Sequence, residues 1–108
     1  MKIFNITKKT PISDDAIELK TVREKTDGML AFQKPRTLCF RTRWGVHTFG
    51  MKYPIDVAVC DEGGVVRAVR NGMAPNRIFF WNPKYARVFE FPSESGVERG
   101  DILRMTDD

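Results

Sequence analysis

Short alternating runs of apolar and polar residues, separated by glycine and proline, restrict this chain to a fold built mainly from β-strands. The strongest signal is Asp61-Glu62-Gly63-Gly64, which lies between two such runs at residues 55–60 and 65–70. Glycine tolerates positive φ, so this segment predicts a tight hairpin turn. Further strands are expected at residues 2–7, 36–42, 77–81, 85–91 and 101–105. Strands spaced about 8 to 12 residues apart favour a small β-sandwich or barrel over alternating βα units.

The segments between the first strands allow more than one structure. Residues 11–15 are expected to form a turn, whereas residues 16–22 fit either a strand or a helix. Their alternation indicates a half-buried strand that pairs with the first one, and we prefer this interpretation. An N-cap at Ser13 or Asp14 would instead begin a helix. Residues 23–32 can hold a short helix or an irregular turn, so at most one or two short helices are expected.

The length of 108 residues predicts a single domain, residues 1–108, built on one core. Of the residues, 42% are hydrophobic, which is too large a share for a disordered chain. No apolar run approaches the roughly 20 residues that span a bilayer, and the chain does not start with a long apolar stretch. We therefore expect a cytoplasmic protein without a membrane partner. In that setting Cys39 and Cys60 are expected to stay reduced and buried.

Positive charge is concentrated in two stretches that contain no acidic residue. The net charge is +4, and the stretches lie between Asp27 and Asp56 and between Glu62 and Glu90. If the two stretches share one face, the domain presents a positive surface that attracts anions. The alternative is an ordinary, well-solvated exterior.

Within these stretches, two segments mix cationic and aromatic side chains, one at residues 41–53 and the other at residues 77–85. Cations pair with phosphate or carboxylate groups, and aromatic faces stack on flat groups. We therefore predict a binding or accessory domain that contacts a small anionic or planar ligand, or a peptide. The candidate ligand-binding residues are Arg41, Arg43, Trp44, His47, Phe49, Met51, Lys52, Asp56, Arg77, Trp81, Asn82 and Tyr85. The alternative is that the aromatic rings fill the core and the cations only surround it.

Catalysis is a second interpretation, and it would depend on His47, the single histidine. A nucleophilic site would need His47 hydrogen-bonded to Cys39 or Cys60 and oriented by Asp56. The spacing of these residues does not require that arrangement, so we do not expect an enzyme. A carboxylate at the start of a strand, such as Asp56, more often binds backbone amides or an arginine.

Other classes of site have weaker support. Zinc is not expected, because three soft ligands lack the paired spacing of a zinc finger. Gly63-Gly64 lacks the strand-to-helix context of a nucleotide-binding loop, so no cofactor is expected. Non-specific nucleic-acid binding is possible for a basic chain but is not favoured. The oligomeric state and the ligand stay open.

The run His47-Thr48-Phe49-Gly50-Met51-Lys52-Tyr53-Pro54-Ile55-Asp56-Val57, followed by the hairpin at Asp61, is distinctive. It resembles the family catalogued as domain of unknown function 192, in which a similar motif precedes a strand, an Asp-x-x-Gly hairpin and another strand. Residues 85–92 and Gly100-Asp101 are also similar to that family. The resemblance implies a compact sandwich or barrel of jelly-roll character and brings no agreed activity, cofactor or catalytic residue. The chain departs from the family in a shorter segment before Gly100.

Overall fold

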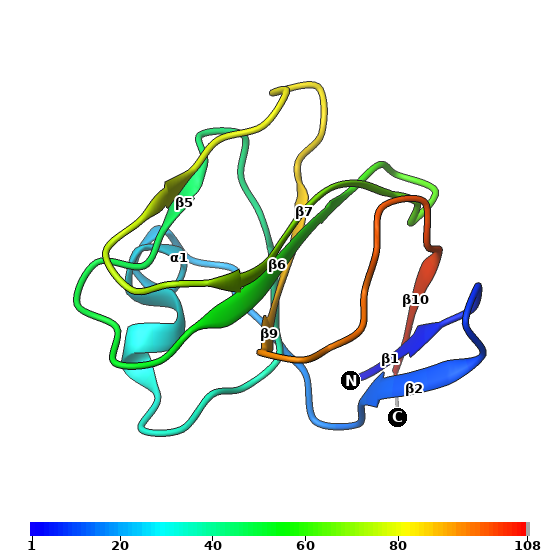
Figure 1. The fold of residues 1–108 in the computed structure, drawn as a ribbon, viewed down its shortest axis with the longest axis horizontal. Coiled ribbons are helices and arrows are strands. Elements are labelled where there is room, and N and C mark those ends of the chain that lie inside the picture. The colour runs from blue at the N-terminus through cyan, green and yellow to red at the C-terminus, as the bar shows by residue number, and fades with distance from the viewer. Residues whose placement is uncertain (108) are drawn as a thin grey trace.

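The computed structural model describes residues 1–107, and ten short strands make up most of its regular structure (Figure 1). The strands are β1 (Lys2–Asn5), β2 (Thr10–Ser13), β3 (Ile17–Glu18), β4 (Leu38–Arg41), β5 (Val46–His47), β6 (Ile55–Cys60), β7 (Val66–Met73), β8 (Ile78–Phe79), β9 (Arg87–Pro92) and β10 (Leu103–Thr106). One α-helix, α1 (Val22–Asp27), continues into a 3-10 turn, η1 (Gly28–Ala31). The mainly β class predicted from the sequence is confirmed.

The strands form three sheets of unequal size. A five-stranded sheet has the order β3-β4-β9-β6-β7, a three-stranded sheet has the order β10-β1-β2, and β5 pairs with β8 in a two-stranded ribbon. In Figure 1 the β5–β8 ribbon and α1 lie on one side of the five-stranded sheet, and β1, β2 and β10 lie on the other. The arrangement is sandwich-like and is not a closed barrel.

The core lies on both faces of the five-stranded sheet. All six residues of β6 are buried. Ile55, Val57 and Val59 belong to the cluster that also contains Met29 of η1 and Phe79 of the β5–β8 ribbon. Ala58 and Cys60 belong to the cluster beneath the three-stranded sheet. The alternation in the sequence therefore separates two buried faces here, as happens in a strand between two layers.

The hairpin predicted at Asp61 is present, and it also fixes the last strand. The Asp61 carboxylate accepts hydrogen bonds from the backbone N–H groups of Gly63, at 2.9 Å, and Val65, at 3.0 Å. Gly64 has a φ of +86°, and a Cβ atom there would lie 2.5 Å from the carbonyl oxygen of Leu103. Glycine is needed at this position for its conformation and for the close approach of β10.

The predictions for the first third of the chain need two corrections. The turn predicted at residues 11–15 is wrong in its first part, because Thr10–Ser13 forms β2 and pairs with β1. The strand predicted at residues 16–22 is correct only for β3, which pairs in parallel with β4 rather than with β1. Thr21 ends the extended segment because its side chain caps α1 in a capping box with Glu24.

The return strand predicted at residues 65–70 continues to Met73. The pairing of β7 with β6 contains a bulge where the strand was expected to end. The register between β6 and β7 shifts between Ile55 and Val57, and Gly72 has a φ of +61°. The Asp56 carboxylate lies at this bulge. It accepts hydrogen bonds from the Gly72 N–H at 2.7 Å and from the Ser95 N–H and hydroxyl at 2.8 and 2.6 Å. Asp56 is 1% exposed. It therefore ties β6 to β7 and to the loop before β10.

We expect Asp56→Ala to lower the free energy of unfolding by about 2 to 4 kcal/mol, because it leaves two backbone N–H groups and a hydroxyl without their shared acceptor. Urea denaturation monitored by circular dichroism measures this. Asp14→Ala is the control, since Asp14 is exposed, and we expect a change within about 0.5 kcal/mol. A loss below about 1 kcal/mol for Asp56→Ala would show that the carboxylate does not stabilise the bulge.

Candidate functional site

A pocket of about 510 Å³ opens on the side of the five-stranded sheet that α1 and the β5–β8 ribbon cover. We call it the Glu90 pocket. Its walls come from α1 and η1, from β4 and the segment that follows it, and from Met51. Its lining residues are Val22, Lys25, Thr26, Asp27, Gly28, Met29, Leu30, Phe40, Arg41, Thr42, Arg43, Trp44, Gly45, Val46, His47, Met51 and Glu90.

Local interactions hold the helical wall in place. Gly28 ends α1 with a φ of +50°, a conformation that glycine adopts without strain. Met29 is buried in the core beneath η1, and its Sδ accepts a hydrogen bond from the backbone N–H of Arg36 at 3.3 Å. The wall is therefore anchored by a buried side chain rather than by the six-residue helix alone.

The opposite wall is fixed by the pairing of β5 with β8. Val46 pairs with Phe79 and His47 with Ile78. Just beyond the ribbon, the Thr48 hydroxyl donates to the carbonyl of Ala74 at 2.7 Å and accepts from the N–H of Arg77 at 2.9 Å. The two segments that mix cations and aromatic rings therefore lie side by side.

Glu90 forms the floor of the pocket. It lies in β9 opposite Leu38 of β4 and Val57 of β6, so it occupies the centre of the sheet. The residue is 4% exposed, and a Cβ atom on Gly28 would lie 3.8 Å from its Oε1. Within residues 1–107 its carboxyl group has no hydrogen bond or ion pair. Burial raises the pKa of the Glu90 carboxyl from the usual 4.5 to about 7.

The cations at the mouth of the pocket differ in how firmly they are held. The Arg41 guanidinium pairs with both carboxylate oxygens of Glu62, at 2.7 and 2.9 Å. Arg43 donates from one guanidinium nitrogen to the carbonyls of Pro83 and Lys84, at 2.5 and 3.1 Å. Lys25 has no ion pair with any residue that the structure describes. It is therefore the mouth cation most available to a ligand.

Two aromatic residues at the mouth have different surroundings. The Trp44 side chain is 86% exposed, and its neighbour Gly45 packs against the ring of Phe80. His47 accepts a hydrogen bond at Nδ1 from the N–H of Phe49, 3.1 Å away, and its ring stacks on that of Phe49. The proton of neutral His47 is thus assigned to Nε2. Among the described residues His47 makes no hydrogen bond with a second ionisable side chain.

The structure brings five of the predicted ligand-binding residues to the Glu90 pocket: Arg41, Arg43, Trp44, His47 and Met51. The other seven do not line it. Trp81, Asn82 and Tyr85 shape the loop before β9, where the Trp81 indole donates to the carbonyl of Tyr85 at 2.8 Å and Asn82 accepts from the N–H of Lys84 at 3.0 Å. Phe49, Lys52 and Arg77 lie around the β5–β8 ribbon, and Asp56 points away from the pocket into its bulge.

Sequence reasoning missed Glu90, the one ionisable group at the floor. The available signal was an acid inside the apolar run Val88-Phe89-Glu90-Phe91, in a strand for which either face could be buried. An acid in the centre of a sheet that is buried on both faces needs a partner, a shifted pKa or a cavity.

Thiol and metal chemistry gain no support from the geometry. Burial raises the pKa of the Cys39 thiol to about 11 and that of the Cys60 thiol to about 12, so neither is a ready nucleophile. Residues 1–107 contain no group of three or more histidine, cysteine or acidic side chains placed to hold a metal ion. The longest helix in the same range, α1, has six residues, far short of a membrane span.

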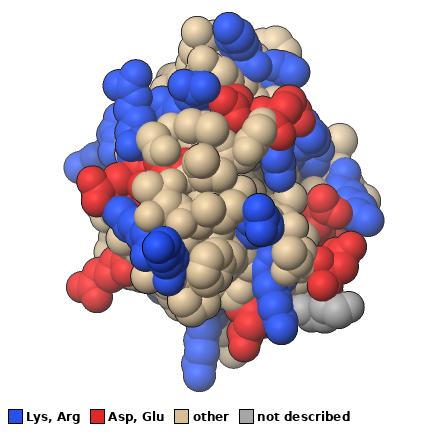
Figure 2. Space-filling view, turned by 90° about the vertical axis from the view of Figure 1, so that its right-hand side faces the viewer, with Lys and Arg blue, Asp and Glu red and all other residues tan. Residues whose placement is uncertain are grey.

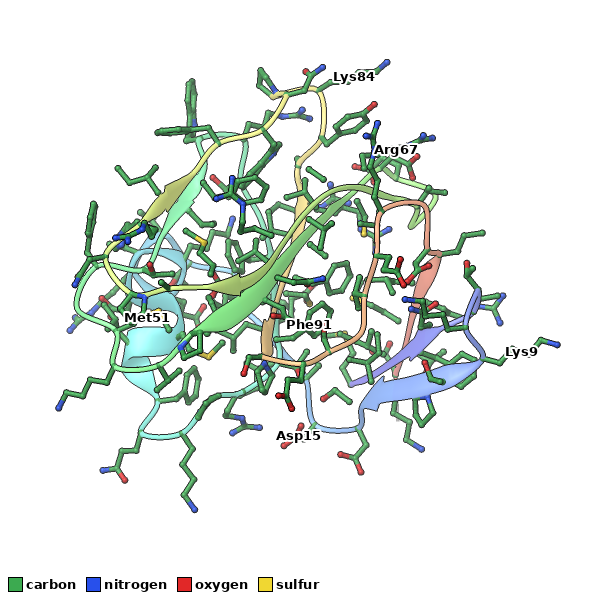
Figure 3. The ribbon with its side chains drawn as sticks, in the orientation of Figure 1. Lys9, Asp15, Met51, Arg67, Lys84 and Phe91 are labelled. Atoms are coloured by element: carbon green, nitrogen blue, oxygen red, sulfur yellow. The ribbon has the colours of Figure 1, made fainter. Side chains whose placement is uncertain are left out.

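The side of the molecule away from the pocket carries charges of both signs. Figure 2 shows the side of the molecule on which the three-stranded sheet lies, where Lys and Arg side chains alternate with Asp and Glu around a centre without charged side chains. Met51 lies at the opposite end of the molecule from Lys9, at the tip of the β1–β2 hairpin (Figure 3). The side in Figure 2 therefore does not present a surface of one charge.

Comparisons with known proteins identify the fold and no family. No family model and no curated protein sequence matches the chain. A crystal structure of a protein of unknown function from Novosphingobium aromaticivorans is similar with a TM-score of 0.77, at 11% identity, over 96% of this chain and 82% of that one. A crystal structure of a "putative transcription regulator" from Sinorhizobium meliloti is similar with a TM-score of 0.69, at 14% identity, over 95% of this chain and 89% of that one. These similarities concern the fold alone.

We expect the stability of the wild-type chain to fall as the pH rises from about 4.5 through about 7, because Glu90 then ionises in the folded state at a cost that the unfolded chain does not have. A group whose folded-state pKa is raised stabilises the fold below its unfolded pKa, and this contribution is lost above the folded one. The shift corresponds to at most about 3.5 kcal/mol. In Glu90→Gln this decrease is expected to disappear.

Urea denaturation of both proteins at intervals from about pH 5 to about pH 8.5 measures this effect. Subtracting the free energy of unfolding of Glu90→Gln from that of wild type at each pH removes the contributions of all other titrating groups. A difference that does not change with pH would mean that Glu90 titrates as an exposed acid.

Proposed function

We propose that this chain is a binding domain that takes a small, flat, anionic ligand in the Glu90 pocket. The observation that carries the proposal is the pocket itself, whose mouth holds Lys25, Arg43 and the exposed ring of Trp44. A pocket of this volume suits a ligand of one or two rings. The apolar walls include Met29, Phe40 and Met51, so the body of the ligand would lie against thioether and aromatic groups.

The charges at the mouth support an anionic ligand. Two acids near the mouth already have partners, since Glu62 pairs with Arg41 and Asp27 lies 3.8 Å from Arg23. Lys25 is half-buried and has no ion pair among the described residues, so its ammonium group can attract an anion at short range. An indole ring that is almost fully exposed can stack on a flat ligand at little cost in desolvation.

Catalysis by His47 and Asp56 has less support than binding. Asp56 is occupied by Gly72 and Ser95, and His47 is occupied at Nδ1 by the backbone of Phe49. General acid–base work needs a pair of ionisable groups within reach of one substrate, and these two residues bind to different parts of the fold.

Nucleic-acid binding is the second candidate, and the basic composition together with the fold similarity to a described "putative transcription regulator" is what favours it. Such binding would fall steeply with added salt, because each neutralised phosphate releases counterions. The resemblance to the domain of unknown function 192 family and a cytoplasmic location remain predictions as well.

The test uses 8-anilinonaphthalene-1-sulfonate, a flat aromatic anion that fluoresces when bound. We expect saturable binding to the folded wild type, about tenfold weaker binding to Trp44→Ala and about threefold weaker binding to Lys25→Gln. Fluorescence titration at constant pH and salt measures the affinities, and thermal denaturation shows that each variant is folded.

Lys9→Gln is the matched control, because it removes the same charge at the opposite end of the molecule (Figure 3). Its affinity for the dye is expected to equal that of wild type. Equal affinities for wild type and both pocket variants would place the dye elsewhere and refute the proposal.

A further inference from the structure

Glu90 differs from the other buried acidic residues in having no partner. Three acids in residues 1–107 are buried: Asp56, Glu90 and Asp101. Asp56 accepts three hydrogen bonds from Gly72 and Ser95. Asp101 accepts from the Asn5 amide and the Glu98 N–H, both at 2.9 Å, and lies 3.4 Å from the Lys8 ammonium. The fold thus supplies donors to two buried carboxylates and none to the third.

A molecule in the pocket can supply the donor that Glu90 lacks. The sheet neighbours of Glu90 are Leu38 and Val57, whose side chains are apolar, and Gly28 above it has no side chain. A carboxylate accepts up to about four hydrogen bonds, and a buried one is stabilised most by a donor that also carries positive charge. A protonated amine or amidine supplies both.

The Glu90 pocket is also electrically polar along its depth. Its floor holds Glu90, whereas Lys25 and Arg43 lie at its mouth. The other acid of the lining, Asp27, lies 3.8 Å from the Arg23 guanidinium. A ligand with one uniform charge would be attracted at one end and repelled at the other. A ligand with a cation at its inner end and an acidic group at its outer end matches both ends at once.

We propose that Glu90 determines the specificity of the pocket by binding the ammonium or amidinium group of a small zwitterion whose acidic group lies at the mouth. This inference rests on the proposed function, since it names the ligand class of the same pocket. It adds a requirement that the basic mouth alone does not impose, namely a hydrogen-bond-donating cation at the inner end of the ligand.

The inference predicts a dependence on pH. The ammonium group binds best to ionised Glu90, so affinity for a zwitterion is expected to rise between about pH 6 and about pH 8. Other charged or titratable groups face the same space from every wall. They are Lys25 and Asp27 of the helical wall, Arg41 and Arg43 on and after β4, and His47 of β5. Tyr53 does not line the pocket, but its pKa is raised by burial and then by the Glu90 charge. The titration of these groups changes the affinity for the acidic end of a ligand. Comparing the affinities of two ligands with the same acidic end removes that change.

The experiment compares 4-(aminomethyl)benzoate with 4-methylbenzoate, which differ only in the amine. Affinities for wild type, Glu90→Gln, Glu90→Asp and Lys9→Gln are measured by NMR titration at about pH 6 and about pH 8. We expect wild type and Lys9→Gln to prefer the amine by about tenfold at the higher pH and by less at the lower pH. Glu90→Gln is expected to bind both compounds equally, and Glu90→Asp to keep part of the preference.

The outcomes separate the two proposals. Equal affinity of wild type for both compounds, or a preference that survives in Glu90→Gln, overturns the role of Glu90 and leaves the pocket as an anion site. Failure of wild type to bind either compound overturns both proposals. Glu90→Gln removes a buried charge, and its thermal denaturation curve shows whether it is folded. A preference that Glu90→Gln abolishes and Glu90→Asp partly restores supports the assignment over a merely structural role.

Discussion

Burial of both faces of the five-stranded sheet is the constraint on which the rest of this structure depends. Every residue of β6 is buried, and so are the four central residues of β9, so each face needs a cover. The three-stranded sheet covers one face. The other face is covered by a six-residue helix, a 3-10 turn and a two-stranded ribbon. Covers built from such short elements do not close over the sheet, and the Glu90 pocket is the space that remains.

The same constraint explains why two acids in adjacent strands have different roles. A carboxylate in a doubly covered sheet loses its water and must find donors or become a weaker acid. Asp56 lies at an irregularity, where Gly72 and Ser95 offer N–H groups that no strand uses. Glu90 lies in regular pairing, where the neighbouring N–H groups already belong to the ladders. Its carboxyl therefore keeps the raised pKa and the open binding capacity that the pocket presents.

The distribution of cations is less simple than the sequence indicates. Several of the positive side chains in the two acid-free stretches hold the structure together: Arg41 binds Glu62, Arg67 binds Asp61, and Arg43 binds backbone carbonyls before β9. These contacts leave fewer charges available to a partner than the net charge suggests. The charge that can serve a ligand is local, at the mouth of the pocket, and it acts together with the acid at the floor.

From Leu38 onward the sequence by itself indicated every strand except β5, together with the hairpin at Asp61 and the two-faced character of β6, because alternation and turn formation depend on neighbours along the chain. No strand was expected at Val46–His47, which is extended through its pairing with β8. It also placed five residues of the pocket lining among its candidates. Only the tertiary structure decided that β3 joins β4 instead of β1, and that Glu90 lies beneath Gly28 without a donor. Those outcomes depend on which distant segments pack together. The alternation of apolar and polar residues along a strand is the same whether a buried acid lies next to hydrogen-bond donors or next to a cavity.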